Sequence, residues 1–231
     1  MGHSPTSKAI MLSIILPPVA VFLTECMMNG IIMINIGFLM GSFDPIHIGH
    51  INMVRLALNS GLLDKVILVP SGHNPWKKEA PAPLSLRIDM INASIKEFGD
   101  KCEASPIEGT FEPPYYSNKP LNHFKEQYKG DNLFILCGTD TVNKIPRWKN
   151  AETDILPFYG IIEIARNDLK KEGELIVKDK SGKEYPYQRI EGSIITSSST
   201  EVRHCISKGL ITYPLINDEV LKMIKDNGLY V

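Results

Sequence analysis

Apolar and polar positions alternate along the chain in two ways, as short runs that are almost entirely apolar and as longer stretches with helical periodicity. Four of the apolar runs have the length of a buried strand, and they lie at residues 31–40, 66–69, 132–137 and 160–165. The stretch after the first run carries one apolar stripe, formed by Ile51, Val54, Leu58 and Leu62. Strands that alternate with helices indicate βαβ units. The sequence therefore predicts an α/β fold, with a doubly wound, mostly parallel sheet and helices on both faces.

The last third of the chain continues this pattern with one interruption. Residues 193–196 are predicted to form a strand, and a helix is predicted to begin at Ser198. Residues 214–230 have the pattern of a capped amphipathic helix. Residues 169–189 are polar and rich in lysine, which is typical of a hairpin inserted at the surface, and they carry no evident chemistry.

Residues 1–32 differ from the rest of the chain. An apolar run at residues 9–23, interrupted by Pro17 and Pro18, resembles the core of a signal peptide or a short membrane anchor. The run is shorter than the ~20 residues that a membrane-spanning helix needs, and a small-residue cleavage site is not evident. We therefore expect a non-catalytic extension at residues 1–32, a single domain at residues 33–231, and no attachment to a membrane.

Composition narrows the classes of function. The 231 residues are 43% hydrophobic and 22% charged, which is enough for one well-buried domain. The formal net charge of −1 argues against an extended nucleic-acid-binding groove, which would require a basic excess, so nucleic acid is not an expected partner. The cysteines form no C-x-x-C pair and fit buried free thiols better than a disulfide framework; they are Cys26, Cys102, Cys137 and Cys205.

The strongest candidate site is the ten-residue segment 41–50, which joins the first apolar run to the first helical stretch. Gly41 lets a ligand approach the backbone, and Gly49 keeps the first helical turn free of side-chain bulk. The free N–H groups at a helix start favour an anion. His47 and His50 are three residues apart, so both imidazoles lie on one face of the turn and can donate hydrogen bonds to one group. A phosphate is the expected ligand.

Two histidines at this spacing also occur as a surface pair or as half of a metal site. A metal site would need a third protein ligand, and no cluster of Cys, Asp or Glu supplies an evident one. The order of a glycine, a Phe-Asp-Pro turn and His-x-Gly-His after a strand is more specific than the histidine pair. We therefore assign no metal ligands among the protein side chains.

Other candidate residues end predicted strands at the same edge of the sheet, where ligands bind in open α/β folds. The loop after the second strand carries Trp76 and Lys77, an aromatic ring and a cation. Asp140 follows the strand 132–137 and either accepts hydrogen bonds from ribose hydroxyls or caps a helix. Trp148 stands between two cations in a polar loop, which favours a stacking platform for a flat charged ring over a position in the core.

A second anion site is predicted at the start of the helix that begins at Ser198. Ser199, Thr200 and the guanidinium of Arg203 can all donate hydrogen bonds to a phosphate. Ser198 and Glu201 also have the spacing of a capping box, which alone would explain an ordinary helix start. This segment therefore indicates an anion site only in combination with the segment 41–50.

Three segments together resemble the motifs of one family. G-S-F-D-P-I-H-I-G-H at residues 41–50 resembles the G-x-F-D-P-x-H-x-G-H motif of the nucleotidyltransferase superfamily. P-R-W at 146–148 and S-S-T-E-V-R at 198–203 resemble two motifs of its nicotinate or nicotinamide mononucleotide adenylyltransferases. The resemblance implies a Rossmann-like fold and a cytoplasmic enzyme of NAD biosynthesis. Such an enzyme joins ATP to nicotinate or nicotinamide mononucleotide and releases pyrophosphate, with Mg²⁺ carried by the ATP phosphates.

The same resemblance implies a role for each matching residue. His47, His50 and Arg203 would stabilise charge in the transition state. Contacts to ATP are implied for Gly41, Ser42, Phe43, His47, Gly49, His50, Gly138, Asp140, Ser198, Ser199, Thr200 and Arg203. Contacts to the mononucleotide are implied for Ser42, Lys77, Tyr116, Ser117 and Trp148. Lys119 and Pro120 depart from the family pattern in the region that holds the pyridine ring, which leaves the exact substrate open.

Other classes of protein remain as alternatives. Phosphopantetheine adenylyltransferases and cytidylyltransferases share the first motif, but the segments 146–148 and 198–203 count against them. Class I aminoacyl-tRNA synthetases also carry a His-x-Gly-His, but this chain is short and lacks a basic RNA-binding surface. A non-catalytic nucleotide-binding protein would bind ATP without releasing pyrophosphate, and the intact set of donors disfavours it.

Overall fold

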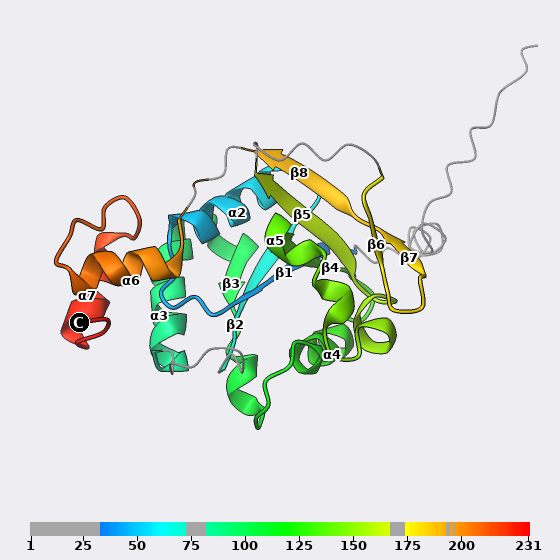
Figure 1. Ribbon diagram of the computed structural model, residues 1–231, viewed down its shortest axis with the longest axis horizontal. Coiled ribbons are helices and arrows are strands. Elements are labelled where there is room, and N and C mark those ends of the chain that lie inside the picture. The colour runs from blue at the N-terminus through cyan, green and yellow to red at the C-terminus, as the bar shows by residue number, and fades with distance from the viewer. Residues whose placement is uncertain (1–32, 73–81, 167–173, 193–194, 196) are drawn as a thin grey trace, which may run out of the picture. The chain divides into compact units, whose positions relative to one another are not determined.

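The computed structural model describes residues 33–72, 82–166, 174–192, 195 and 197–231 (Figure 1). Residues 34–231 form one compact unit. Within the described part of the chain, no helix combines the length and the apolar character needed to cross a bilayer. The predicted extension at residues 1–32 lies outside the described residues.

A sheet of six described strands is the frame of this unit, and each pair of neighbouring strands is parallel. In spatial order the strands are β3 (Cys102–Ala104), β2 (Lys65–Pro70), β1 (Asn35–Gly41), β4 (Asn132–Gly138), β5 (Gly160–Arg166) and β8 (Gln188–Gly192). The chain winds outward from β1 to β3, then returns to β4 on the other side of β1. This reversal confirms the predicted doubly wound, Rossmann-like sheet and puts its switch point between β1 and β4.

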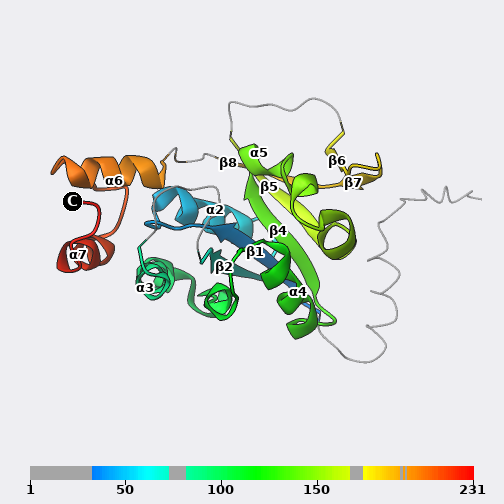
Figure 2. The same ribbon diagram turned by 60° about the horizontal axis from the view of Figure 1, so that its bottom comes forward.

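Helices cover both faces of the sheet (Figures 1 and 2). The longer helices are α2 (Ile48–Asn59), α3 (Leu84–Ile95), α4 (Asn118–Gln127), α6 (Ser199–Ser207) and α7 (Asp218–Asp226). The shorter ones are α5 (Thr139–Val142), η1 (Lys96–Lys101), η2 (Ile107–Thr110), η3 (Ile145–Arg147) and η4 (Ala151–Ile155). Helices α6 and α7 lie side by side next to α3 in both views.

Two hydrophobic cores lie on opposite faces of the sheet, because successive side chains of a strand point to opposite sides. In β1, Leu39 belongs to the core that packs α2, α3, α6 and α7 against one face. Phe38 belongs to the core that packs α4, η3 and η4 against the other, and its ring stacks on Phe124 of α4 with 4.6 Å between centroids. Central strands buried on both faces are expected to be continuously apolar, which is why the sequence identified them.

Strand β8 corrects the predicted position of the last strand. The sequence predicted that strand at residues 193–196, whereas the structure has it at Gln188–Gly192 and leaves Ile195 outside any strand. Residues 193, 194 and 196 lie outside the described residues. The prediction was wrong because β8 forms an edge of the sheet and has Ile190 as its one apolar residue. Its Arg189 lies beside Glu163 of β5, with 3.9 Å between Nη1 and Oε2.

The predicted surface hairpin is present in the described part of residues 169–189. Strands β6 (Ile176–Lys178) and β7 (Glu184–Pro186) pair in an antiparallel, two-stranded sheet. Asp179 holds the turn between them, because its carboxylate accepts hydrogen bonds from the backbone N–H groups of Ser181 and Lys183. Residues 188 and 189 of the predicted insertion belong to β8 instead.

Three cysteines are free thiols, as predicted. Cys102 and Cys137 are buried and Cys205 is half-buried, whereas Cys26 lies outside the described residues. Burial raises the pKa of the Cys102 and Cys137 thiols to about 12, so these two side chains behave as small apolar groups of the core.

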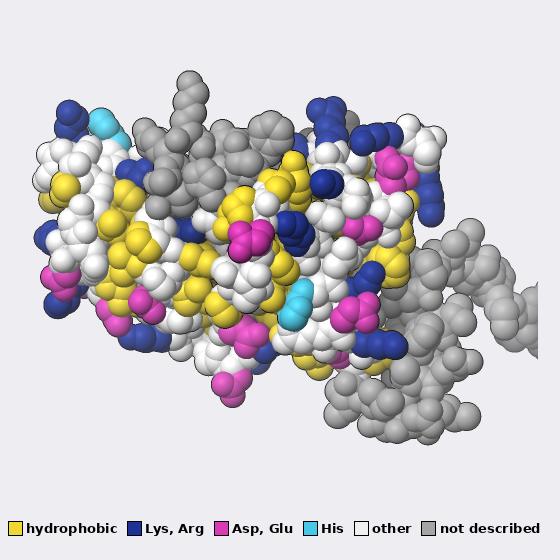
Figure 3. Space-filling model, turned by 90° about the horizontal axis from the view of Figure 1, so that it is seen from below, with side chains coloured by type: hydrophobic (Ala, Val, Ile, Leu, Met, Phe, Trp, Pro, Cys, Tyr) yellow, Lys and Arg dark blue, Asp and Glu magenta, His cyan; other side chains and the backbone are white. Residues whose placement is uncertain are grey.

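Charged side chains of both signs share the surface. On the face that Figure 3 shows, lysine and arginine side chains are interspersed with aspartate and glutamate. This mixture agrees with the net charge of −1. Binding of an anion therefore depends on the local arrangement of a few donor groups and not on a broad positive surface.

Candidate active site

The segment 41–50 forms a tight turn between β1 and α2, at the carboxyl edge of the sheet. Phe43 has a positive φ of 47°, a conformation that costs a non-glycine residue about 1–3 kcal/mol. Burial offsets this cost, because the Phe43 ring is buried and packs against His50 with 4.8 Å between ring centroids. A Cβ at Gly41 would lie 3.3 Å from the same ring, so a glycine permits this packing. The turn thus fixes where α2 begins.

The two histidines of the motif cap α2 reciprocally. His47 is the N-cap residue, and its Nδ1 accepts a hydrogen bond of 3.1 Å from the backbone N–H of Gly49. Nδ1 of His50 accepts a hydrogen bond of 3.3 Å from the backbone N–H of His47. The two rings lie against each other, with 3.8 Å between centroids. A Cβ at position 49 would come within 3.0 Å of the His47 ring, so Gly49 leaves the ring its place.

This capping assigns the proton of each imidazole. Because both Nδ1 atoms accept hydrogen bonds, each neutral ring carries its proton on Nε2, which is left to donate to a ligand. Burial lowers the pKa of His47 to about 4. Burial and the neighbouring His47 lower the pKa of His50 well below its ordinary value. At pH 7 the pair therefore consists of two uncharged Nε2–H donors.

The stability of the protein should fall as the pH falls from about 6.5 to about 4. Over this range an unfolded chain protonates His47, whereas the folded protein keeps it neutral, so protons favour the unfolded state. His47 alone should contribute a loss of about 3 kcal/mol in the free energy of unfolding. His47→Asn keeps a good N-cap acceptor but does not titrate, so its stability should depend less steeply on pH. Urea denaturation at several pH values measures this difference.

The exposed His204 of α6 provides the control for this prediction. The variant His204→Asn should retain the slope of the unmodified protein. If His47→Asn showed that same slope, the buried neutral state of His47 would be contradicted.

Helix α6 begins at the same edge of the sheet. Ser198 is its N-cap residue, and its Oγ accepts a hydrogen bond of 3.1 Å from the backbone N–H of Glu201, as its spacing predicted. The hydroxyl of Ser199 donates to the carbonyl oxygen of Pro45 at 2.9 Å. The start of α6 is thereby attached to the turn that precedes α2, although the two segments are more than 150 residues apart in sequence.

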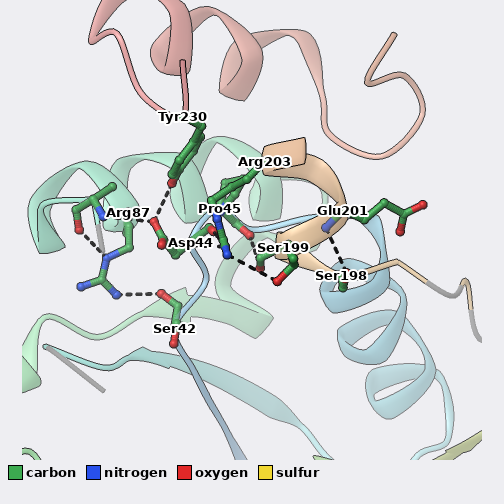
Figure 4. A network of polar contacts seen from close by, with 11 residues as sticks. Ser42, Asp44, Pro45, Arg87, Ser198, Ser199, Glu201, Arg203 and Tyr230 are labelled. Carbon is green, nitrogen blue, oxygen red and sulfur yellow. Dashed lines mark hydrogen bonds and ion pairs between the residues drawn. The ribbon is translucent and has the colours of Figure 1, made fainter. Parts of the chain in front are cut away.

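Arg203 makes the second attachment between α6 and the turn (Figure 4). Its Nη1 donates a hydrogen bond of 2.7 Å to the carbonyl oxygen of Asp44, and the same nitrogen lies 4.0 Å from Oδ2 of the Asp44 carboxylate. Its Nη2 lies 3.4 Å from Oγ1 of Thr200. The structure therefore brings the guanidinium to the same turn that carries the imidazoles.

A cavity of about 350 Å³ lies where these segments meet. Its lining includes ten of the twelve residues predicted to contact ATP, namely Ser42, Phe43, His47, Gly49, His50, Gly138, Asp140, Ser198, Ser199 and Thr200. The other two are adjacent in the fold, because Gly41 precedes Ser42 and Arg203 bonds to Asp44. Asp140 lies in the first turn of α5 behind Gly138, which is the N-cap residue, so the alternative role of Asp140 as a helix cap is wrong.

The remaining lining residues were not found from the sequence. Met53, Ile164 and Ile195 supply apolar surface, while Thr139 and Ser197 supply hydroxyls. The buried hydroxyl oxygens of Thr139 and Ser197 have no hydrogen-bond partner among the described residues. Ile164 and Thr139 lie at the carboxyl ends of β5 and β4. Their position at the end of a predicted strand is the feature of the sequence that could have identified them as part of the site.

Arg87 of α3 joins the first loop to the second. Its side chain is fully buried and donates to three backbone carbonyl oxygens, at 2.8 Å to Ala82, 2.7 Å to Ser42 and 3.0 Å to Gly72. The backbone N–H of Ser71 also donates to the carbonyl oxygen of Gly41 at 2.8 Å. These bonds place the starts of both loops at one edge, as predicted. Lys77 lies outside the described residues.

Glu108 of η2 supports the second loop from its other side. Its carboxylate is buried and lies 3.4 Å from the backbone nitrogen of Gly72, which donates to it. Burial is the main reason that the pKa of Glu108 is raised, and the bond from Gly72 works in the opposite direction. A Cβ at Gly72 would come within 2.6 Å of the Tyr115 ring, so this glycine allows the segment around Tyr115 to approach.

Of the described residues predicted to hold the mononucleotide, Ser42 lines the ATP cavity and the other three do not. The ammonium group of Lys149 lies 4.5 Å from the centroid of the Tyr116 ring, which brings residues 115–117 next to the loop that carries Trp148. Trp148 is half-buried against the core beneath that loop. Tyr116, Ser117 and Trp148 do not line the cavity described above. Their contact with a mononucleotide stays a prediction.

Comparison with known proteins gives consistent results. A model of the cytidylyltransferase-like family matches residues 38–204. Probable nicotinate-nucleotide adenylyltransferases of Clostridium botulinum (strain Kyoto / Type A2) and Methylacidiphilum infernorum (isolate V4) are each 32% identical to this chain. The alignments cover 86% and 83% of this chain and 100% and 89% of the relatives. Plasmodium falciparum nicotinic acid mononucleotide adenylyltransferase complexed with NaAD shares the fold, with a TM-score of 0.68 and 21% identity over 85% of this chain and 97% of that one.

The doubly wound sheet, the cavity at its switch point and the family match define the protein as a nucleotidyltransferase of the cytidylyltransferase-like class. The two bacterial relatives allow a closer placement, because they align over nearly their whole length. The chain belongs to the nicotinate-nucleotide adenylyltransferase family.

Proposed function

We propose that the protein transfers the adenylyl group of ATP to nicotinate mononucleotide, which yields nicotinate adenine dinucleotide and pyrophosphate in NAD biosynthesis. The observation that carries this proposal is the convergence of two helix starts, α2 and α6, on one cavity. The N-terminal end of a helix favours phosphate, and a triphosphate is long enough to contact both. At α2 the backbone N–H groups of Ile48 and Gly49 already donate to Leu215 and His47, so the imidazoles supply the donors there. Because the reaction uses ATP, we expect the protein to act in the cytosol.

The chemistry requires no covalent intermediate. An oxygen of the mononucleotide's 5′-phosphate attacks the α-phosphorus of ATP in line, and the bond from that phosphorus to the bridging oxygen of the β-phosphate breaks. That oxygen leaves with pyrophosphate. The protein therefore has to align two polyanions and direct donors at the charge that develops on the α-phosphoryl oxygens.

The described residues supply such donors. His47 and His50 both line the cavity, and each has its Nε2–H left as a neutral donor because its Nδ1 accepts from the backbone. Arg203 adds a positive charge at the turn, and the start of α6, which carries it, adds backbone N–H groups. Asp140 at the first turn of α5 suits the ribose hydroxyls. In this proposal His47, His50 and Arg203 are the catalytic residues.

Magnesium is proposed to enter with the nucleotide. Among the described residues, no group of three or more His, Cys, Asp or Glu side chains is arranged to hold a metal ion. Near the cavity, the Asp44 carboxylate accepts hydrogen bonds from Ala82 and Tyr230, whereas Asp140 is exposed. This donor set fits a Mg²⁺ ion that is bound mainly by phosphate oxygens and water. When bound, the ion would neutralise part of the triphosphate charge.

Nicotinate is favoured over nicotinamide by the charge next to the predicted ring site. Lys149 lies over Tyr116, and Arg147 stands on the other side of Trp148 in sequence. A carboxylate gains from nearby cations, whereas a carboxamide gains little. The names of the two bacterial relatives and the NaAD bound by the Plasmodium protein support the same choice.

The experiment that tests this function measures pyrophosphate release from ATP and Mg²⁺ with nicotinate mononucleotide, with nicotinamide mononucleotide and with no acceptor. We expect the highest kcat/KM with nicotinate mononucleotide and no release without an acceptor. Dinucleotide formation is followed in the same samples by chromatography. ATP binding without pyrophosphate release in any sample would contradict the proposal.

A further inference from the structure

The residue before the C-terminal one contacts the motif turn directly. The hydroxyl of Tyr230 donates a hydrogen bond of 2.6 Å to Oδ1 of Asp44, across 186 residues of sequence (Figure 4). The Tyr230 ring packs against the core beneath α7, and the side chain is half-buried. Burial and the bond to Asp44 raise the pKa of Tyr230, so the phenol stays a neutral donor.

Helix α7 brings Tyr230 to this position. Val220 and Ile224 of α7 are buried in the core that α3 shares. Asn217 caps α7 by accepting from the backbone N–H of Val220 at 2.8 Å. At the surface, Lys96 at the start of η1, directly after α3, forms an ion pair of 2.6 Å with Glu219 of α7. The end of the chain is therefore anchored before it reaches Asp44.

The Asp44 carboxylate is held between three elements of the fold. It is 7% exposed, and its Oδ1 accepts from Tyr230 and from the backbone N–H of Ala82 at 3.1 Å. Its Oδ2 lies 4.0 Å from Nη1 of Arg203, at the outer limit of an ion pair. That nitrogen makes its short bond to the backbone carbonyl of Asp44 instead. The Asp44 carboxylate and the Arg203 guanidinium therefore lie close together without a hydrogen bond between them.

We propose that Tyr230 is a positioning residue which holds Asp44 away from Arg203, so that the donors of the guanidinium stay available to the phosphates of ATP. Without the phenol, the carboxylate is free to turn toward Arg203 and to form a close pair with it. Such a pair competes with the triphosphate for the same donors. The inference rests on the proposed function for its ligand, but it concerns the binding of ATP and requires no turnover.

The variant Tyr230→Phe tests this inference because it removes the hydroxyl and keeps the ring. Binding of a non-hydrolysable ATP analogue with Mg²⁺ is measured by calorimetry, well below the melting temperature of the variant. We expect the dissociation constant to rise about tenfold. The control is Tyr213→Phe, since Tyr213 lies in the same C-terminal region with 76% of its surface exposed, and it should bind as the unmodified protein does.

A second variant separates positioning from a general loss of stability. In Tyr230→Phe combined with Asp44→Asn, no carboxylate is left to pair with Arg203, so affinity for the ATP analogue should recover most of the loss. A structural defect would not be repaired by a second substitution at the same contact. Unchanged affinity in Tyr230→Phe, or a loss that Asp44→Asn does not reduce, overturns the inference. In steady-state kinetics of Tyr230→Phe, KM for ATP should rise and KM for the mononucleotide should stay constant.

If the protein released no pyrophosphate with either mononucleotide, the proposed function would fail while the binding experiment would remain decisive for Tyr230. Conversely, normal affinity for the ATP analogue in Tyr230→Phe would reject the positioning role of Tyr230 and would not bear on the proposed adenylyl transfer.

Discussion

Replacing His50 with alanine should lower turnover by about 10²- to 10³-fold in a protein that still folds. The reason is that Nε2–H of His50 is a preorganised donor at the cavity, held in place by the Nδ1 bond from His47 and by the Phe43 ring. The loss should appear in kcat for pyrophosphate release, since the developing charge is greatest in the transition state. The free energy of unfolding should fall by only about 1 kcal/mol, the usual effect of a lost helix cap.

A second substitution at this position separates capping from catalysis. The amide oxygen of asparagine can replace Nδ1 as the acceptor for the His47 N–H, but asparagine is too short to replace the Nε2–H donor. His50→Asn should therefore be as inactive as His50→Ala and closer to the unmodified protein in stability. His204→Ala, at an exposed histidine of α6, should leave turnover unchanged. Normal turnover by His50→Ala would refute the proposed role of the imidazole.

Replacing Arg87 with methionine should produce the largest loss of stability, about 3–5 kcal/mol in the free energy of unfolding. Methionine fills much of the same space, but it leaves the carbonyl oxygens of Ala82, Ser42 and Gly72 without their donor. The buried Glu108 also loses a neighbouring positive charge. Arg87→Lys should recover little of the loss, because one ammonium group does not span three carbonyls as a guanidinium does.

Arg55 of α2 provides the matched control for Arg87. Its guanidinium forms an ion pair of 2.7 Å with Glu97, but both side chains are substantially exposed. Arg55→Met should therefore cost no more than about 1 kcal/mol. Urea denaturation of both variants at pH 7.5 gives the comparison. Similar midpoints for Arg87→Met and Arg55→Met would show that the three carbonyl bonds contribute little.

The sequence predicted those parts of the molecule that local patterns determine. Strands β1, β2, β4 and β5 are apolar runs because both of their faces are buried. The cap at Ser198 was predicted from the spacing of Ser198 and Glu201, whereas the last helix was predicted without its cap residue, which is Asn217. The segment 41–50 could also be recognised in the sequence, because its glycine, turn and two histidines are consecutive and together form the start of one helix. The ATP contacts were inferred from the resemblance to the family motifs, and most of these residues line one cavity.

What the sequence did not predict depends on contacts between distant residues. Tyr230 and Asp44 are 186 residues apart, and nothing near either residue indicates the other. Arg87 fits a helix pattern equally well as a surface or a buried residue, and its three acceptors come from separate loops. Strand β8 was misplaced because an edge strand with one apolar residue lacks the pattern of a buried strand.

The central claim is that the starts of α2 and α6 bind the same triphosphate. The most direct measurement is a crystal structure of the protein with Mg²⁺ and an ATP analogue that has a methylene group between the α- and β-phosphorus atoms. We predict that its phosphates lie in the cavity, with oxygens about 3 Å from Nε2 of His50 and from backbone nitrogens at the start of α6. An analogue bound elsewhere, or phosphates that contact one of the two helix starts and leave the other in water, would contradict the claim.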